Sequence, residues 1–302
     1  EYISEERATL FGVSAKYIDA INNCGLIPKK NFNLTNLRTI CSTGSPLSKE
    51  GFEYVYKNIK SDVHLASISG GTDIVSCFVL GNLMQSVYLG EIQNRGLGMD
   101  VDIFDEKGIS VKNKKGELVC KKPFPSMPIK FWNDEGNKKF KSAYFEKYKN
   151  VWHHGDFAKL TKKGGFIIFG RSDTTLNPGG VRLGTSEIYN VVENFIEIQE
   201  SIVIGQSWKN DIRIILFVVL NKGYNLTDKI KKKIKEAIKI KASPRHVPKK
   251  IISILEIPKT KNGKLVELAV KQSVEGNKVK NLEALSNPDS LKQFKNIKEL
   301  YE

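Results

Sequence analysis

One stretch of this 302-residue chain separates two different sequence patterns: Gly170-Arg171-Ser172-Asp173-Thr174-Thr175-Leu176-Asn177-Pro178-Gly179-Gly180-Val181-Arg182. A proline followed by two glycines predicts a fixed loop with unusual backbone angles. The arginines near its two ends are able to bind phosphate oxygens through charge-assisted hydrogen bonds. A plain linker needs none of these features, although a charged hinge loop is the alternative that composition alone leaves open.

The residues that precede this loop predict two kinds of sheet. Residues 37–42 and 63–68 are short apolar runs typical of buried strands, with a helix expected over 48–59 between them. Strand, helix and strand in this order indicate the edge of a parallel α/β sheet, where ligands bind beyond the carboxyl ends of strands. From about residue 75 to 170, short alternating segments between Gly- or Lys-rich turns predict an antiparallel, barrel-like unit.

The residues that follow the loop predict a compact α+β domain. Helices are expected over 187–196 and 226–240, strands over 201–204, 212–220 and 250–257, and a last helix opening at Gly263. The predicted fold class is therefore α/β: a parallel α/β edge and an antiparallel barrel-like unit over 1–172, then a small α+β domain over 173–275. A polar tail is expected over 276–302.

The charge and composition exclude some classes of protein. The chain has 48 Lys and Arg against 33 Asp and Glu, a formal net charge of +15, but only seven of the basic residues are Arg. Because the lysines are spread along the whole chain, we expect no nucleic-acid partner; such proteins concentrate Arg and aromatic residues in one stripe. An anionic small ligand suits the basic excess equally well. The longest apolar run, 212–220, is too short to span a bilayer, so no membrane partner is expected.

The cysteines and the first residues suggest a compartment. None of the four cysteines belongs to a Cys-x-x-Cys pair, which indicates reduced thiols. The chain opens on Glu1 and a charged stretch, so no signal peptide is expected. Both features favour a cytoplasmic protein.

Two further segments carry groups suited to chemistry. One of them is the segment Trp152-His153-His154-Gly155-Asp156, which is expected to end a strand. The Asp156 carboxylate is able to accept hydrogen bonds from two vicinal hydroxyls, as on a ribose. An ordinary aspartate in a turn is the alternative. Adjacent histidines on a strand point to opposite faces, which disfavours a shared metal ion. Pro258-Lys259-Thr260-Lys261-Asn262-Gly263-Lys264 is an exposed turn, and Lys264 is long enough to reach a neighbouring site, unless it is simply solvated.

Taken in order, these segments resemble the adenylate-forming acyl-CoA synthetases over residues 35–275. The motifs are Ser-Thr-Gly-x-Pro, Ser-Gly-Gly-Thr-Asp, His-Gly-Asp, the loop from Gly170 to Ile188, and Pro-Lys-Thr-x-x-Gly-Lys. The resemblance implies that a carboxylate attacks the α-phosphate of ATP, giving an acyl-adenylate and pyrophosphate, and that coenzyme A then displaces AMP. The family's phosphate loop is absent, so the chain is expected to be a carboxyl-terminal half that forms no adenylate by itself.

The resemblance also assigns roles to single residues. Lys264 resembles the catalytic lysine that bridges the carboxylate and the phosphate, and Thr72 resembles the threonine that hydrogen-bonds the α-phosphate. Asp73 stands where relatives use glutamate as a ligand of Mg²⁺. The other implied nucleotide contacts are Gly44, Ser45 and Pro46 along adenine, Asp156 at the ribose, Arg171 near ribose and phosphate, Asn177 within the loop, and Arg182 on a phosphate.

The remaining implied roles concern the acyl group, the hinge and coenzyme A. Gly70 and Gly71 line the implied acyl pocket; acetate-specific relatives carry Trp at the position of Gly70, so a longer acid is expected. Stretches 67–74, 243–248 and 279–288 favour acetoacetate, while propionate and butyrate stay open. Further implied roles are Asp173 as the hinge, Gly180 on the pantetheine path and Lys235 at the adenine-phosphate end of coenzyme A, for which a solvated helix face is equally suitable.

Two other possibilities accompany this assignment. A chain that binds an adenylate without catalysing its formation is the alternative from a different class, against which the intact Lys264, Asp156, Arg171 and Arg182 count. In addition, Lys264 is the type of lysine that a lysine acyltransferase silences, because acylation removes the charge that the reaction needs.

Overall fold

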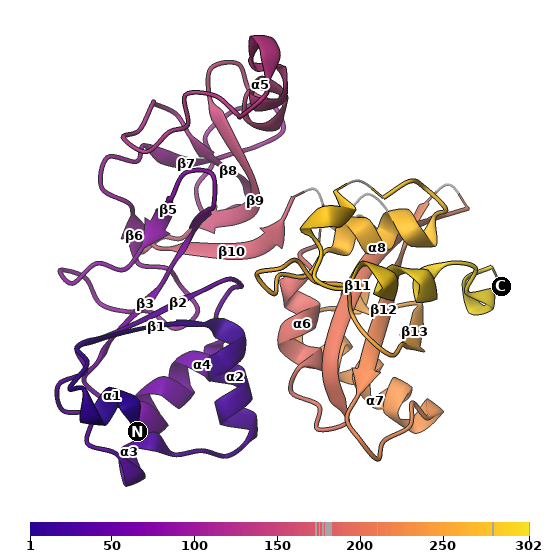
Figure 1. Cartoon of the computed structure of the whole chain (residues 1–302), viewed down its shortest axis with the longest axis horizontal. Helices are drawn as coiled ribbons and strands as arrows, with labels where there is room; N and C mark the ends of the chain where they lie inside the picture. The colour runs from indigo at the N-terminus through magenta and orange to yellow at the C-terminus, as the bar shows by residue number, and fades with distance from the viewer. Residues whose placement is uncertain are drawn as a thin grey trace. The chain divides into compact units, whose positions relative to one another are not determined.

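The computed structural model describes residues 1–172, 174, 176, 178, 183–209, 211–279 and 281–301. The chain divides into two compact units, Glu1–Ile168 and Phe169–Glu302 (Figure 1). The division lies within strand β10 (Phe166–Arg171), a few residues before the limit at 172 that the loop composition suggested.

Unit 1 begins with a parallel three-stranded sheet in the order β1-β2-β3 (Leu10–Ser14, Thr39–Thr43, His64–Ser67). The predicted strands at 37–42 and 63–68 are confirmed as β2 and β3. Strand β1 escaped prediction because its burial alternates only weakly and Leu10 is exposed. The helices of this part are α1 (Tyr2–Glu5), α2 (Ala15–Asn23), α3 (Pro28–Asn31), α4 (Lys49–Tyr54) and the π-helical η1 (Val55–Ile59).

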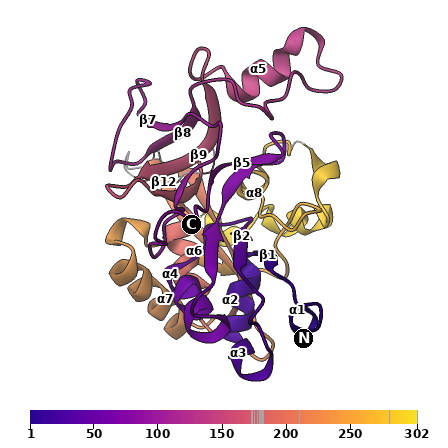
Figure 2. The same ribbon diagram turned by 90° about the vertical axis from the view of Figure 1, so that its left-hand side faces the viewer.

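Helices α2 and α4 begin at serine caps and pack against this sheet (Figure 2). Ser14 Oγ accepts a hydrogen bond from Tyr17 N (3.1 Å), and Ser48 Oγ accepts one from Gly51 N (3.0 Å). Their apolar faces meet the strands in one buried cluster, which includes Ile18, Phe52, Val55, Ile40 and Leu65. The helix predicted over 48–59 is therefore present as α4 and η1.

The rest of unit 1 is antiparallel, as predicted. Strands β4 (Ser69–Gly71), β5 (Ser76–Leu80) and β6 (Asn94–Arg95) form one small sheet. A second sheet has the order β10-β9-β8-β7, with β9 at Trp152–Leu160, β8 at Gly116–Cys120 and β7 at Val101–Phe104. The short helices η2 (Glu135–Asn137) and α5 (Lys138–Tyr144) precede β9, and Trp152 is buried among their aromatic side chains.

Unit 2 is built on a sheet in the order β11-β12-β13 (Ile198–Trp208, Asp211–Leu220, Lys250–Ser253). Successive side chains of a strand point to opposite faces, so the continuous apolar sequence of β12 supplies two cores. Ile214, Leu216 and Val218 pack with α6 (Ser186–Val192) and α7 (Asp228–Lys241). Ile215 and Phe217 pack with α8 (Glu267–Val274) on the other face.

The carboxyl-terminal residues are part of the second core of unit 2. The sequence indicated a polar, weakly patterned tail over 276–302, but Leu285, Leu291, Phe294 and Leu300 are buried beside α8. The apolar residues were not recognised because they lie on short 3₁₀ turns, where no helical or strand period repeats. These turns are η5 (Leu282–Ala284), η6 (Pro288–Phe294) and η7 (Lys298–Leu300); a further turn, η4 (Pro244–His246), lies between α7 and β13.

The described residues give one finding on membrane-spanning helices and one on the cysteines. No helix there is both long and apolar enough to cross a membrane. The four cysteines are free thiols; Cys120 is buried, Cys41 and Cys77 are half-buried, and Cys24 is exposed. Burial raises the pKa of the thiols of Cys41, Cys77 and Cys120.

One buried carboxylate stabilises the antiparallel sheet of unit 1. Glu117 in β8 is 3% exposed, its Oε2 lies 3.0 Å from His153 Nε2 in β9, and its Oε1 accepts a hydrogen bond from Lys147. Burial by itself raises the pKa of Glu117, but the bonds to His153 and Lys147 outweigh burial and lower the pKa from 4.5 to about 2. The ionised form is therefore the one that the fold favours.

We predict that Glu117→Gln lowers the free energy of unfolding by roughly 2 kcal/mol at pH 7, because it removes the charge that Lys147 faces. A depressed pKa stabilises the fold above pH 4.5, and this contribution disappears as the pH falls toward 2. Urea unfolding between pH 7 and pH 3 should therefore show a difference between variant and parent that shrinks with acidity. Glu135→Gln, at an exposed position, is the control; an equal loss at both positions would contradict the prediction.

Candidate functional site

The carboxyl ends of β2 and β3 bring two predicted motifs to one edge of the parallel sheet. The strands pair in register from Thr39 with His64 to Ser42 with Ser67, and Ile68 N donates to Ser42 O (2.9 Å). Gly44-Ser45-Pro46 therefore leaves β2 beside the point where β4 and the Thr72–Asp73 turn begin. Gly44 has a φ of +85°, a conformation that glycine adopts without the steric cost of a side chain.

Asp156 is joined to the same edge through side chains. Its Oδ2 accepts a hydrogen bond from Ser69 Oγ (3.4 Å) and lies 3.6 Å from His154 Nε2, which also lies 3.2 Å from Gly70 O. Asp156 and His154 are buried, and His154 packs edge-on against Phe78. The expectation that Asp156 ends a strand is wrong, because β9 continues to Leu160. Its carboxylate nevertheless belongs to the cluster at the edge of β2 and β3.

The histidines of β9 point to different partners. His153 bonds Glu117, whereas His154 approaches Gly70, as alternation along a strand predicts. The described residues contain no group of three or more His, Cys, Asp or Glu side chains able to hold a metal ion.

Asp73 is exposed in the turn after β4 and has one partner that the sequence did not suggest. Tyr144, the last residue of α5, donates its hydroxyl hydrogen to Asp73 Oδ2. The Tyr144 ring stacks on Trp152, with centroids 3.6 Å apart and planes 14° from parallel. The aromatic residues Phe140 and Tyr144, four apart on one helix face, were the signal that could have indicated this anchor.

A single carboxylate of this kind suits Mg²⁺, which usually keeps several waters and binds one or two carboxylates together with substrate phosphates. Asp73 is exposed, and its second oxygen, Oδ1, is not the atom that Tyr144 bonds. The donor set therefore fits a metal ion that arrives with a nucleotide, rather than a cage made of protein ligands alone.

Lys264 lies in unit 2, on a turn that precedes the last helix. The prediction that this helix opens at Gly263 is wrong: α8 begins at Glu267, and Gly263 has a φ of +75° within the turn. A bridge between Lys259 and Leu265 closes the turn, and Thr260 N donates to Lys264 O (2.9 Å). The Lys264 side chain is exposed.

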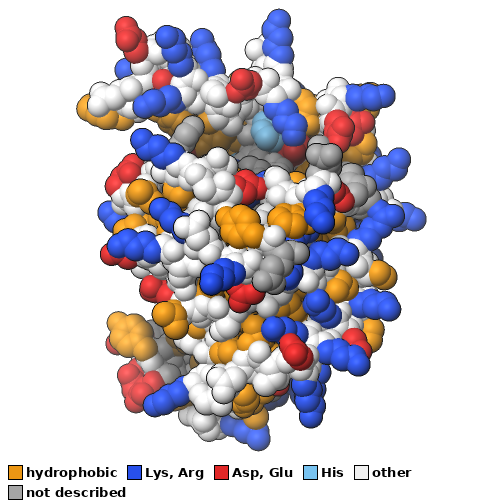
Figure 3. Space-filling view, turned by 90° about the vertical axis from the view of Figure 1, so that its right-hand side faces the viewer, with side chains coloured by type: hydrophobic (Ala, Val, Ile, Leu, Met, Phe, Trp, Pro, Cys, Tyr) orange, Lys and Arg blue, Asp and Glu red, His pale blue; other side chains and the backbone are white. Residues whose placement is uncertain are grey.

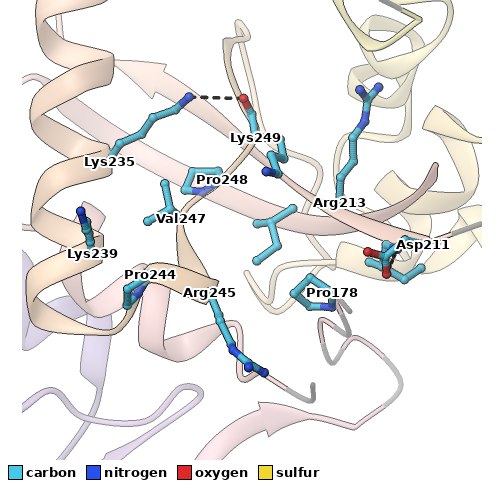
Figure 4. A pocket seen from close by; sticks show the side chains of 12 residues that line it. Pro178, Asp211, Arg213, Lys235, Lys239, Pro244, Arg245, Val247, Pro248 and Lys249 are labelled. Atoms are coloured by element: carbon cyan, nitrogen blue, oxygen red, sulfur yellow. Dashed lines mark hydrogen bonds between the residues drawn. The ribbon is translucent and has the colours of Figure 1, made fainter. Parts of the chain in front are cut away.

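Unit 2 also contains a basic pocket of about 710 Å³, formed by α7, β12 and the residues around η4. Its charged lining consists of five basic residues and one acid: Arg213, Lys235, Lys239, Arg245, Lys249 and Asp211. Figure 4 shows Lys235 reaching from α7 toward the backbone of Lys249, whose carbonyl oxygen accepts a hydrogen bond from its Nζ (3.3 Å). Lys235 therefore lines a pocket, in contrast to the alternative of a purely solvated helix face.

Arg213 contributes no free charge to the pocket, because its guanidinium is directed away from the other cations and donates to the carbonyl oxygen of Leu300 (Figure 4). It is 8% exposed, its Nε donates to Gln206 (2.8 Å), and its guanidinium lies 3.7 Å from the centre of the Trp208 ring. Burial lowers the pKa of Arg213. Elsewhere, Lys and Arg side chains are spread over the visible face rather than gathered in one stripe (Figure 3). The pocket is thus a local concentration of positive charge suited to phosphates.

Comparisons with known proteins show which enzymes this chain resembles. Residues 187–264 match the AMP-binding enzyme C-terminal domain. Acetoacetyl-coenzyme A synthetase of Rhizobium meliloti (strain 1021) is 56% identical over 99% of this chain and 46% of that protein. Acetoacetyl-CoA synthetase of Xenopus tropicalis is 48% identical over 97% of this chain and 44% of that protein. Residues 187–264 are thus similar to a known AMP-binding domain, and nearly the whole chain is similar to slightly less than half of each of these two synthetases.

Solved structures of similar proteins agree with the fold. Acetoacetyl-CoA synthetase from Streptomyces lividans has a TM-score of 0.91 and 38% identity, over 99% of this chain and 46% of that one. A benzoate CoA ligase from Burkholderia xenovorans LB400, at 21% identity and a TM-score of 0.71 over 89% of this chain and 52% of that one, shares the fold. The chain spans about half the length of the curated relatives it matches, and corresponds to the carboxyl-terminal part of these AMP-binding enzymes.

Some residues that the resemblance assigned have no described geometry. Asp173, Asn177, Gly180 and Arg182 lie outside the described residues. Arg171 is described at the end of β10, where it is exposed.

Gly70 occupies a position where two backbones approach closely. A Cβ atom there would lie 2.1 Å from Ser76 O and 2.7 Å from Cys77 Cα, both in the paired strand β5. At Gly71 a Cβ would lie 2.9 Å from the His154 ring. Glycine at position 70 thus has a reason in strand pairing, beside the acyl-pocket role that the resemblance implies.

We predict that Gly70→Ala lowers the free energy of unfolding by roughly 2 kcal/mol, because the methyl group must separate β4 from β5. Gly12→Ala is the matched control, since a Cβ there meets nothing within 4 Å. Thermal unfolding of both variants measures the difference. The prediction fails if the two variants have the same midpoint.

Proposed function

We propose that this chain is the carboxyl-terminal half of an acid–thiol ligase that makes acetoacetyl-CoA from acetoacetate, ATP and coenzyme A. The reaction passes through acetoacetyl-adenylate and releases pyrophosphate and then AMP. The observation that carries the proposal is the 56% identity to an acetoacetyl-coenzyme A synthetase over 99% of the chain. The TM-score of 0.91 to a second such enzyme supports it. We propose the cytoplasm as its compartment, because thiols stay reduced there.

In this proposal, unit 1 supplies most of the side chains that bind the nucleotide. The Asp156 carboxylate accepts hydrogen bonds from the ribose hydroxyls, and Gly44-Ser45-Pro46 lies along adenine at the neighbouring strand end. Thr72, exposed in the turn after β4, donates to the α-phosphate. The acyl group lies by Gly70 and Gly71. Arg171 and Arg182 complete the phosphate contacts, and Asn177 helps to hold the loop between them.

The first step is an in-line substitution at phosphorus, so positioning and charge neutralisation dominate it. A carboxylate oxygen of acetoacetate bonds to the α-phosphorus as the bond to pyrophosphate breaks. Lys264 bridges the two negatively charged reactants and stabilises the charge that they share. Lys264 acts in this first step only, and Asp173 keeps the hinge role that the resemblance implies.

Asp73 holds Mg²⁺ in this proposal, with its carboxylate oriented by Tyr144. When bound, the ion neutralises phosphate charge during the first step. Aspartate is shorter than the glutamate that relatives use at this position. The hydrogen bond from Tyr144 restricts the orientation of the Asp73 carboxylate, so that the ion meets it in one direction.

Coenzyme A is the substrate of the second step. Its thiol loses its proton to water, the sulfur attacks the carbonyl carbon of the adenylate, and AMP leaves with the electron pair of the broken C–O bond. The basic pocket takes the phosphate-bearing nucleotide end through Lys235 and its neighbours, while the pantetheine arm passes Gly180. The exposed Lys264 is also open to a lysine acyltransferase, whose product would lack the charge that the first step uses.

The substrate is tested with the complete protein that contains this chain. We predict AMP formation with acetoacetate at a kcat/KM at least about 10-fold above those for acetate, propionate and butyrate. Lys264→Ala should reduce AMP formation about 100-fold or more, because it removes a charge that acts in the transition state. Preference for a saturated acid would replace acetoacetate as the substrate, and absence of AMP with every acid would favour a non-catalytic adenylate-binding protein.

The pocket is tested separately. We predict that Lys235→Ala raises the KM for coenzyme A about 10-fold and leaves the KM for ATP unchanged, because it removes one charge-assisted phosphate contact. Lys233→Ala, an exposed lysine on the same helix that does not line the pocket, is the control. Equal effects of the two substitutions would show that only the overall charge matters.

A further inference from the structure

The turn that carries Lys264 is paired along one side with residues 284–287. Lys261 N donates to Ala284 O (3.0 Å), Ser286 N donates to Lys259 O (2.9 Å), and Thr260 and Leu285 form an antiparallel bridge. The carboxyl-terminal residues thus add a short strand to this turn. Such pairing fixes the backbone on which Lys264 stands.

Asn287 extends this pairing with its side chain. Its Oδ1 accepts a hydrogen bond from Lys259 N (2.9 Å), and its Nδ2 donates to Ile257 O (3.0 Å). These two backbone groups flank Pro258, which has no N–H of its own to offer. An asparagine amide provides both a donor and an acceptor, so a single side chain replaces the pairing of a peptide group.

The position of Asn287 is itself fixed by the core of unit 2. Leu285 and Leu291, on either side of it in the chain, are buried, and Ser273 Oγ of α8 donates to Leu291 O (3.0 Å). Phe294 packs edge-on against Phe217 of β12, with ring centroids 4.9 Å apart. The core therefore holds this part of the chain against the turn.

The contacts continue from Asn287 to Lys264 in two steps. Thr260, bridged to Leu285, receives Lys264 N at its Oγ1 (3.1 Å) and donates its own N–H to Lys264 O (2.9 Å). On the other side, Lys259 forms an ion pair with Glu200 of β11. Because the Lys264 side chain is exposed, its direction depends on this bonded backbone rather than on packing around the amine.

We propose that Asn287 is a positioning residue for Lys264: it holds the turn so that the lysine amine meets the nucleotide in the adenylate-forming step. The inference rests on the proposed function, in which Lys264 acts in the first step only. A loosened turn spreads the amine over several directions and lowers the fraction in the reactive geometry. The thioester-forming step, which does not use Lys264, is unaffected.

The test uses the complete protein and measures the two steps separately. Pyrophosphate release with acetoacetate and ATP reports the first step; thioester formation from preformed acetoacetyl-adenylate and coenzyme A reports the second. For Asn287→Ala we expect kcat of the first step to fall about 10-fold, with the KM for ATP little changed and the second step within about 2-fold of the parent. Asn277→Ala, an exposed asparagine with the same chemical change, should leave both steps unchanged.

A second variant and a physical measurement guard against general unfolding. Asn287→Asp keeps the acceptor for Lys259 N but loses the donor to Ile257 O, so the first step should be intermediate. Trypsin should cleave after Lys261 and Lys264 faster in Asn287→Ala than in the parent, because the turn opens more often. Equal losses in both steps, or no loss in the first, would overturn the proposal. If the parent protein releases no pyrophosphate in response to acetoacetate or another carboxylic acid, the proposed function fails instead.

Discussion

The parallel pairing of β2 with β3 is the constraint on which the proposed nucleotide site of unit 1 depends. One register, from Thr39 with His64 to Ser42 with Ser67, decides that both strands end at the same level. A shift by one residue would turn the buried side chains of a strand to its opposite face, so the apolar cluster around Ile40 and Leu65 maintains this register. The residues that follow the strands, to which the proposed function assigns nucleotide contacts, are thus placed by the core behind them.

In unit 2 the corresponding constraint is the two-sided apolar strand β12. Its alternate residues require cover on both faces, and α6 and α7 cover only one of them. The other face needs α8 together with the buried residues of the carboxyl-terminal turns, which explains why a segment of polar composition is part of the core. Tyr189 ties the layers together: its hydroxyl donates to Glu267 of α8 (3.0 Å) and accepts from Val203 N of β11 (3.1 Å).

The sequence predicted the presence of helices and strands better than it predicted where single residues lie within or between them. Strong apolar runs gave β2, β3 and β12, and the repeat of Ile234 and Ile238 gave α7, because burial imposes these patterns directly. Local chemistry misled in two places. Gly263 was expected to open a helix, but it has a positive φ within a turn. Asp156 was expected to end a strand, but it lies within the long strand β9. Tyr144 was missed because its partner Asp73 is 71 residues away, and the spacing of Phe140 and Tyr144 indicates a helix face but not that partner.

Glycines show why a substitution between relatives has more than one physical meaning. An absent side chain at Gly70 can make room for a substrate, but it also lets Ser76 O approach to a distance that no Cβ permits. A relative with a large side chain at this position must therefore separate its strands as well as fill the space. The backbone of β4 and β5 would then differ together with the pocket, so the residue type at position 70 alone does not determine the length of the acid. Under the proposed function, the spacing of the β4–β5 hairpin is therefore expected to influence substrate preference together with the residue at position 70.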